Sequence, residues 1–150
     1  MQEKKEFFCK VNVEWKREKM GILKSEGFHD IDIATPPKFG GHPGLWTPEH
    51  LYVASLTSCF MSTFLSIAEI SNLNFLSFQL SGEGKLEEIE PFKKIISEIK
   101  LKPVITVGSE ALKKRAEKLV KKAHENCIIA NSMKTTVEVE PLIIVKEASI

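Results

Sequence analysis

The first part of the chain alternates between apolar and polar side chains. Phe7, Cys9, Val11, Val13 and Trp15 share one parity, and Lys10, Asn12, Glu14 and Lys16 share the other. A period of two predicts a strand with one buried face, so Cys9 is expected to be a buried, structural residue. Two further short strands are expected at residues 20–25 and 28–34. Three such strands joined by tight links predict an antiparallel meander.

A loop and a long uncharged segment come next. Residues 35–46 hold three prolines and three glycines, which predicts a long loop of the kind that often lines a site. Thr47 is the expected N-cap and Pro48 the first helical residue of a helix that reaches about Ile70. Because this helix is apolar on nearly all sides, we expect it to be central and covered on several faces.

The same helix has to be considered as a possible transmembrane helix. Residues 51–68 carry no charge, which is close to the length that a spanning helix needs. Six of these residues are Ser or Thr, and no second segment of this kind occurs. We therefore expect a buried helix in a soluble protein, without a membrane partner.

The second half of the chain predicts two strands, a helix and a final strand. Leu76, Phe78 and Leu80 alternate, and so do residues 95–101, in a strand expected to end at Pro103. Ser109 is the expected cap of a second helix with the apolar stripe Leu112, Ala116, Leu119, Val120 and Ala123. Residues 135–146 are expected to form one last strand despite Pro141.

These elements predict an α+β fold of antiparallel sheets and a long central helix, within a single domain over residues 1–150. One sheet and one further helix offer too little area to enclose the central helix. An intertwined homodimer, in which the central helices pack together, is therefore expected.

Composition narrows the class of protein. The 150 residues are 43% hydrophobic and 27% charged, with 21 basic and 20 acidic side chains, as in a globular domain. A formal charge of +1 argues against a strongly basic nucleic-acid binder. No signal-peptide pattern opens the chain, and three cysteines are too few for a disulfide scaffold, so we expect a cytoplasmic protein.

Chemistry-bearing motifs are few. The sequence contains no GxGxxG, GxxxxGK[ST], HExxH or CxxC motif, and His124 with Cys127 is too small a set for a metal site. We expect neither a metal nor a cofactor. Two thiols remain as candidates: Cys59 in the middle of the apolar helix and Cys127 just after the second helix. Taken singly, each would be interpreted as a small structural core residue.

Their conjunction is more specific. Pro48-Glu49-His50-Leu51 opens the helix, Ser58-Cys59-Phe60 lies at its centre, and Ala123-His124-Glu125-Asn126-Cys127 follows later. This ordered set resembles the OsmC/Ohr family of thiol-dependent hydroperoxide reductases, over most of the chain. The resemblance implies an OsmC-like fold and a cofactor-free peroxidase. Cys59 would attack an organic hydroperoxide or hydrogen peroxide as thiolate, Cys127 would resolve the sulfenic acid as a disulfide, and an external dithiol, such as a dihydrolipoyl protein, would regenerate both.

A thiolate in an apolar helix needs stabilisation, because burial raises the pKa of a thiol. We therefore expect a cation beside Cys59, and the resemblance assigns this role to Arg17. The family's commonest setting is Gly-Arg-Asp-Gly, whereas this chain has Lys16-Arg17-Glu18-Lys19, so Lys16 and Lys19 remain alternatives.

The resemblance also assigns Glu49, as the glutamate that pairs with the arginine. Ten helical residues separate Glu49 from Cys59 by ~15 Å along the axis, so the two cannot touch within one chain. The active site is thus expected at the dimer interface, with Arg17 and Glu49 supplied by the partner.

Further assignments stay open. His124 is interpreted as a cation at a helix C-terminus rather than as the base of a Cys-His pair. His50 and the rings of Phe39, Trp46, Phe60 and Phe64 are candidates for an apolar peroxide pocket. The alternative functions are a small-molecule binding or thiol-carrier protein on the same fold with little peroxidase activity, and a dimeric module with inert thiols.

Overall fold

The computed structural model describes residues 5–147. The chain forms two compact units, Met1–Leu51 and Tyr52–Ile150, and each is described by itself.

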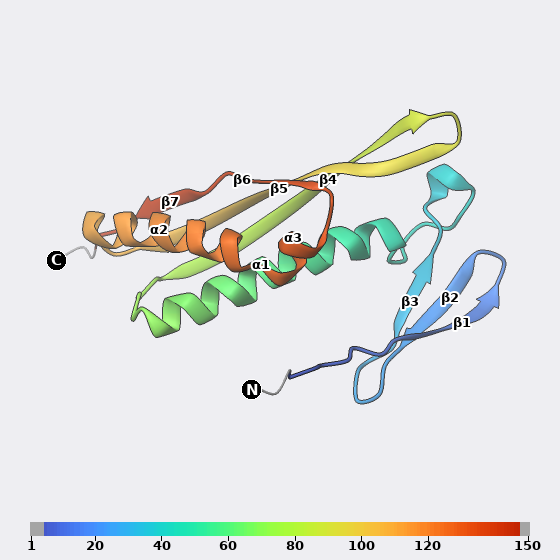
Figure 1. Ribbon diagram of the computed structural model, residues 1–150, viewed down its shortest axis with the longest axis horizontal. Helices are drawn as coiled ribbons and strands as arrows, with labels where there is room; N and C mark the ends of the chain where they lie inside the picture. The colour runs from blue at the N-terminus through green and yellow to red at the C-terminus, as the bar shows by residue number, and fades with distance from the viewer. Residues whose placement is uncertain (1–4, 148–150) are drawn as a thin grey trace. The chain divides into compact units, whose positions relative to one another are not determined.

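The first unit is built on a three-stranded antiparallel sheet in the order β1-β2-β3 (Figure 1). Its strands are β1 (Asn12–Arg17), β2 (Met20–Lys24) and β3 (Ile31–Ala34). The predicted meander is therefore confirmed. The loop after β3 holds a short 3₁₀ helix, η1 (Pro37–Phe39), and Gly41 lies so close to the carbonyl of Thr35 that a side chain would clash there.

The burial predicted for the first strand is wrong. All six residues of β1 are exposed, including Trp15 at 77%, and Cys9 is exposed as well. Val13 and Trp15, which share one face of this strand, are 62% and 77% exposed. The alternation correctly marks an apolar face, but a single chain leaves that face uncovered.

Helix α1 (Pro48–Ile70) has the bounds that the sequence predicts. Thr47 caps its start, because its buried hydroxyl accepts a hydrogen bond from the backbone N–H of His50 at 3.0 Å. Within the described chain, α1 buries one stripe only, at a spacing of four: Leu56, Phe60, Phe64 and Ala68. The expected cover on several faces is not supplied by this chain alone.

By length and composition, α1 is the one described helix that could cross a membrane. That test is also passed by core helices of soluble proteins. Here the buried stripe of α1 belongs to the same hydrophobic core as the sheet residues Ile99, Leu101 and Ile105.

The second unit contains a four-stranded mixed sheet. The long strands β4 (Ser77–Glu90) and β5 (Lys93–Val107) pair antiparallel, whereas β6 (Thr136–Val139) and β7 (Leu142–Val145) both pair parallel with β5. A purely antiparallel arrangement was expected, and it is wrong for β6 and β7. The reason is the crossover through a helix after β5, which returns the chain to the same end of the sheet.

Pro103 does not end its strand as predicted. It lies fully buried inside β5, opposite Leu80 of β4. The carbonyl of Leu101 accepts a hydrogen bond from the N–H of Glu140, so the nitrogen of Pro103, two residues on, faces the same edge. At that point β6 gives way to β7 around Pro141, so the missing N–H of Pro103 interrupts no ladder.

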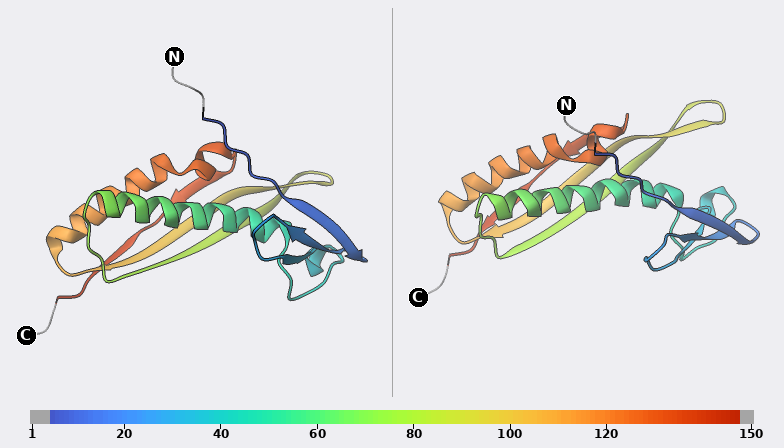
Figure 2. Two further views of the ribbon diagram at one scale, coloured as in Figure 1. Left: turned by 90° about the horizontal axis from the view of Figure 1, so that it is seen from below. Right: turned by 60° about the horizontal axis from the view of Figure 1, so that its bottom comes forward.

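The crossover consists of α2 (Glu110–Asn126) and the single turn α3 (Ile128–Ser132). Ser109 caps α2 as predicted, by accepting a hydrogen bond from Leu112 N at 3.3 Å. Figure 2 shows α1 and α2 on the same face of the sheet, and the core lies between them and β5. The predicted stripe is buried at Ala116, Leu119, Val120 and Ala123.

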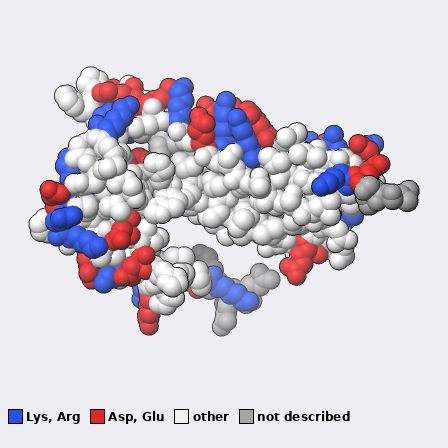
Figure 3. All heavy atoms as spheres, turned by 180° about the vertical axis from the view of Figure 1, so that it is seen from behind, with Lys and Arg blue, Asp and Glu red and all other residues white. Residues whose placement is uncertain are grey.

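A band without charged side chains crosses the face drawn in Figure 3. Helix α1 has no Asp, Glu, Lys or Arg between Glu49 and Glu69, so its exposed side is uncharged as well. Its uncovered side chains include apolar and small polar groups: Ser58, Met61, Ser62, Leu65 and Ser66. This exposed side of α1 is a surface that the described part of the chain leaves without cover.

Candidate functional site

Two free thiols, 68 positions apart in the sequence, meet in the second unit. Cys59 is half-buried in the middle of α1, and Cys127 is fully buried at the junction where α2 ends and α3 begins. The Cys127 thiol is hydrogen-bonded to the Cys59 sulfur. The structure therefore brings together the two cysteines that the sequence analysis singled out.

Three kinds of donor surround the Cys59 sulfur. Burial by itself raises the pKa of this thiol, but hydrogen bonds from the backbone N–H groups of Ile129 and Ile128 and from the Cys127 thiol lower it, and the nearby Thr63 hydroxyl also acts to lower it. Together the donors outweigh burial and hold the pKa of Cys59 below its usual range.

The backbone donors come from the first turn of α3. The N–H groups at a helix start have no partner within the helix, so Ile128 and Ile129 are free to point at the sulfur. Cys127 is the residue immediately before this turn, and its carbonyl accepts the first hydrogen bond of α3, from Asn131 N at 3.0 Å. One short turn thus places a thiol and two N–H donors beside Cys59.

The pKa of Cys127 moves the other way. Burial raises it, the N–H of Ala130 opposes that rise, and Cys59 adds to it, because the Cys127 proton is held in the hydrogen bond and a second negative charge beside the first would be repelled. Cys59 is therefore the thiol that ionises first, and Cys127 keeps its proton.

Thr63 lies one turn after Cys59 on α1. Its hydroxyl is 3.9 Å from the Cys59 sulfur and donates to the carbonyl of Cys59 at 2.7 Å. A hydroxyl has one proton, so Thr63 must turn away from the carbonyl in order to donate to a thiolate. We rank it below the α3 N–H groups as a stabiliser of the ionised sulfur.

This arrangement suits a two-electron thiol reaction. An ionised sulfur is the nucleophilic form, and a second thiol in contact with it can close a disulfide without a large movement of the chain. Within the described residues, no group of three His, Cys, Asp or Glu side chains could hold a metal ion.

The three candidate cations all lie in the first unit and differ in their partners. Lys16 forms an ion pair with Asp32 at 2.9 Å, and Lys19 donates to the carbonyl of Phe39 at 3.2 Å. Arg17 ends β1, is exposed, and has no hydrogen bond or ion pair with the described residues. Of the three, Arg17 is the side chain left available for another group.

Glu49 also lies in the first unit, in the first turn of α1. Its Oε2 atom is buried and lacks a hydrogen-bond partner within the described chain, and no ion pair joins it to Arg17 there. A buried acceptor of this kind is costly unless something pairs with it. Because α1 is one continuous helix, the expected separation of Glu49 from Cys59 along its axis holds.

Sequence reasoning missed the donors from α3. This helix has five residues and no apolar period, so nothing in the pattern predicts it. The proposed aromatic pocket is wrong in part, because Phe60 and Phe64 are fully buried in the core, where Phe64 stacks on Phe78 with ring centroids 5.1 Å apart. His124 lies in the last turn of α2, as expected.

Comparisons with known proteins agree with this architecture. A family model described as OsmC-like protein matches residues 41–141. The uncharacterized protein YmaD of Bacillus subtilis is 29% identical over 140 residues, which cover 89% of this chain and 90% of that relative.

Two solved structures extend the comparison. An OsmC-like protein of unknown function from Vibrio cholerae has a TM-score of 0.79 and 28% identity, covering 89% of this chain and 97% of its own. The organic hydroperoxide resistance protein OsmC of Legionella pneumophila has a TM-score of 0.73 and 24% identity, covering 93% and 100%. The second likeness concerns the fold alone.

Proposed function

Because the chain belongs to the OsmC-like protein family, we propose that it is a thiol-dependent hydroperoxide reductase with Cys59 and Cys127 as its redox pair. Proteins of this family include organic hydroperoxide resistance proteins. The observation that carries the proposal is the shared site of the two free thiols, in which the pKa of Cys59 is lowered and that of Cys127 is raised.

The first step oxidises Cys59. Its thiolate attacks the terminal oxygen of a hydroperoxide, the O–O bond breaks, and the alkoxide leaves and takes up a proton as the alcohol. Cys59 becomes a sulfenic acid: its sulfur gives up two electrons, and the peroxide takes them up as the O–O bond breaks. The N–H groups of Ile128 and Ile129 favour the ionised sulfur that this step requires.

The second step forms the disulfide. Cys127 loses its proton and attacks the Cys59 sulfur, the S–O bond breaks, and water leaves. An external dithiol then returns two electrons and two protons and becomes a disulfide itself. This step requires a second thiol close to the Cys59 sulfur, and Cys127 is already hydrogen-bonded to it.

We further propose a homodimer in which the partner completes the site. The exposed apolar face of β1, the uncharged face of α1 and the unpaired Oε2 of Glu49 are all surfaces or groups that a single chain leaves unsatisfied. Arg17 of the partner subunit would then approach the Cys59–Cys127 pair, oriented by Glu49 of the partner subunit. The proposal places this reaction in the cytoplasm, where a dithiol reductant is available.

A count of free thiols tests the proposal. The fully reduced protein has three thiols per chain, and one equivalent of cumene hydroperoxide should leave one. Cys9→Ser is the matched control: this variant should start with two thiols and lose both. Cys59→Ser should lose none. Thiols that persist in the folded wild-type protein would contradict the peroxidase and favour the binding or inert alternatives.

A further inference from the structure

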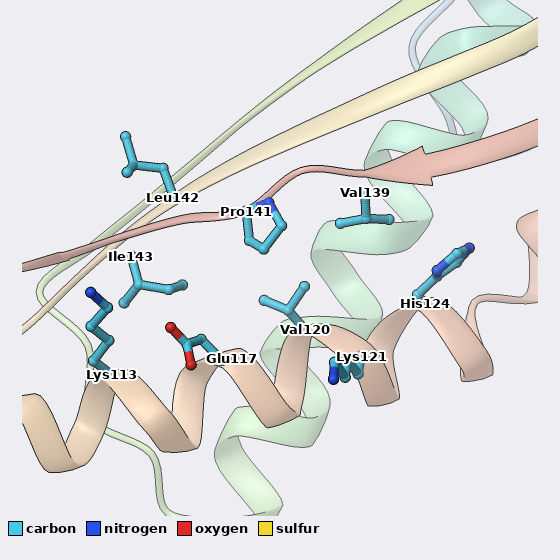
Figure 4. Close-up of a pocket in the computed structure, with 9 residues that line it drawn as sticks. All are labelled: Lys113, Glu117, Val120, Lys121, His124, Val139, Pro141, Leu142 and Ile143. Atoms are coloured by element: carbon cyan, nitrogen blue, oxygen red, sulfur yellow. The ribbon is translucent and has the colours of Figure 1, made fainter.

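A second candidate site lies on the flank of α2. A pocket of about 470 Å³ opens between α2 and the segment that carries β6 and β7 (Figure 4). Its size is that of a small-molecule site. Its lining residues belong to the second unit, and neither Cys59 nor Cys127 is among them. The pocket is therefore distinct from the dithiol site.

The floor of the pocket is apolar. Val120 of α2 and Ile143 of β7 are 3% and 8% exposed, and Val139 and Pro141 line the same space. Figure 4 shows the side chains of Val120 and Ile143 directed into the gap between helix and strand, whereas Leu142 points away from it. Such a floor suits a hydrocarbon group, because filling it removes apolar surface from water.

The rim of the pocket is mainly basic. Lys113, Lys121 and His124 recur on one face of α2, and Lys113 is half-buried. Glu117 lies between the two lysines on the same face and carries the opposing charge. No ion pair joins Glu117 to Lys113 or Lys121 in the part of the chain that the structure describes, so the lysines retain their donors. Two permanent positive charges against one negative charge favour an anion.

We propose that this pocket binds a small amphipathic carboxylate, with its carboxylate at the basic rim and its hydrocarbon chain on the floor. The two lysines supply charge-assisted hydrogen bonds at the rim, where the carboxylate stays partly hydrated. The apolar floor selects a medium-length alkyl body over a free inorganic anion. This inference does not depend on the redox chemistry of Cys59.

Titration of the reduced, isotope-labelled full-length protein with sodium octanoate tests the inference by NMR. Saturable shifts are expected at the backbone amides of Val120, Lys121 and Ile143, with no matching response to octylammonium chloride. Octanol, which has the chain without the charge, should bind at least severalfold more weakly. Equal binding of octanol and octanoate, stronger binding of octylammonium, or no saturable shift with octanoate would each overturn the proposal.

Three variants of exposed residues on α2 sharpen the test. Lys121→Gln should weaken octanoate binding by about two- to fivefold, as expected for one solvent-exposed charge pair. Glu117→Gln should tighten it by a similar factor, because the opposing charge is gone. Lys118→Gln, on the same helix but outside the pocket, is the matched control and should leave the affinity unchanged. Equal affinities of all three variants would contradict the proposal.

Discussion

Cys59 and Cys127 are two thiols of one site whose environments push their pKa values apart. Backbone N–H groups from α3 favour the ionised form of Cys59, whereas Cys127 keeps its proton because it is buried beside that sulfur. A cation was expected from the sequence, but the described donors lower the pKa of Cys59 without one. Arg17 of a partner would therefore lower further a Cys59 pKa that the chain's own donors already lower.

The lowered pKa of Cys59 predicts how the rate of its alkylation depends on pH. Because the pKa of Cys59 is lowered, its thiolate persists at pH values where an ordinary thiol is protonated. The rate of alkylation by iodoacetamide in the Cys9→Ser background should rise with pH and level off at a lower pH than for free cysteine. Cys127→Ala removes one donor, so its profile should shift to higher pH. A wild-type profile at or above that of free cysteine would contradict the assignment.

The cysteine pair could be predicted, but only through the resemblance. Neither Cys59 nor Cys127 differs by itself from a core cysteine, and it is their order with Pro48-Glu49 that is distinctive. The roles of Ile128 and Ile129 could not be predicted, because backbone donors leave no signature in side-chain type. The sequence alone left Lys16, Arg17 and Lys19 as alternatives, and the structure adds only that Lys16 and Lys19 have other partners in the described chain.

At the scale of elements, the helix caps were predicted correctly, whereas the parallel pairing of the last two strands was not. Thr47 and Pro48 fix the start of α1, and Ser109 fixes the start of α2, because caps act on their own helix. The parallel pairing of β6 and β7 depends on a distant strand, and the tolerance of Pro103 depends on the gap between those two strands. No pattern within either segment contains that information.

The contact of α1 with β4 gives a prediction about stability. A side chain at Gly82 would clash with Thr57 Oγ1 and press on Val53 and Leu101, so α1 can lie against β4 only because this residue is glycine. Gly82→Ala should lower the free energy of unfolding by about 1–3 kcal/mol, the usual cost of overpacking, measured as a lower urea midpoint.

Two further variants control that experiment. Gly108→Ala places its methyl group where no atom lies within 4 Å, so the urea midpoint should change little. Thr57→Ala combined with Gly82→Ala removes the clashing oxygen and should recover part of the loss. A Gly82→Ala protein as stable as Gly108→Ala would show that the helix and the strand do not approach as described.

At the scale of the whole molecule, the sequence predicted more burial than one chain provides. The alternation over residues 7–15 predicts a buried face, and the apolar circumference of α1 predicts a helix buried on several sides. In the structure, Trp15 is 77% exposed and Met61 is 41% exposed. The α+β class and the family were predicted correctly because they follow from element order and motifs. The burial of residues 7–15 and of α1 was not predicted correctly, because burial depends on what else packs against these segments.

The proposed homodimer yields a test on the exposed face of α1. Ser62→Lys introduces a charge on the uncharged, exposed side of α1 and should convert a dimer into a monomer or an aggregate in sedimentation velocity. Gln79→Lys, at an exposed position of β4, is the matched control and should remain dimeric. A wild-type protein that sediments as a monomer would refute the dimer while leaving the dithiol pair intact.

The most direct test of the redox pair is to map the bond that one equivalent of cumene hydroperoxide creates. We predict a single intramolecular disulfide between Cys59 and Cys127, identified by peptide mass after digestion without reduction, with Cys9 still alkylatable. Dihydrolipoamide should reverse it. A product in which Cys59 remains a free thiol, or in which the disulfide joins Cys9 to another residue, would contradict the account.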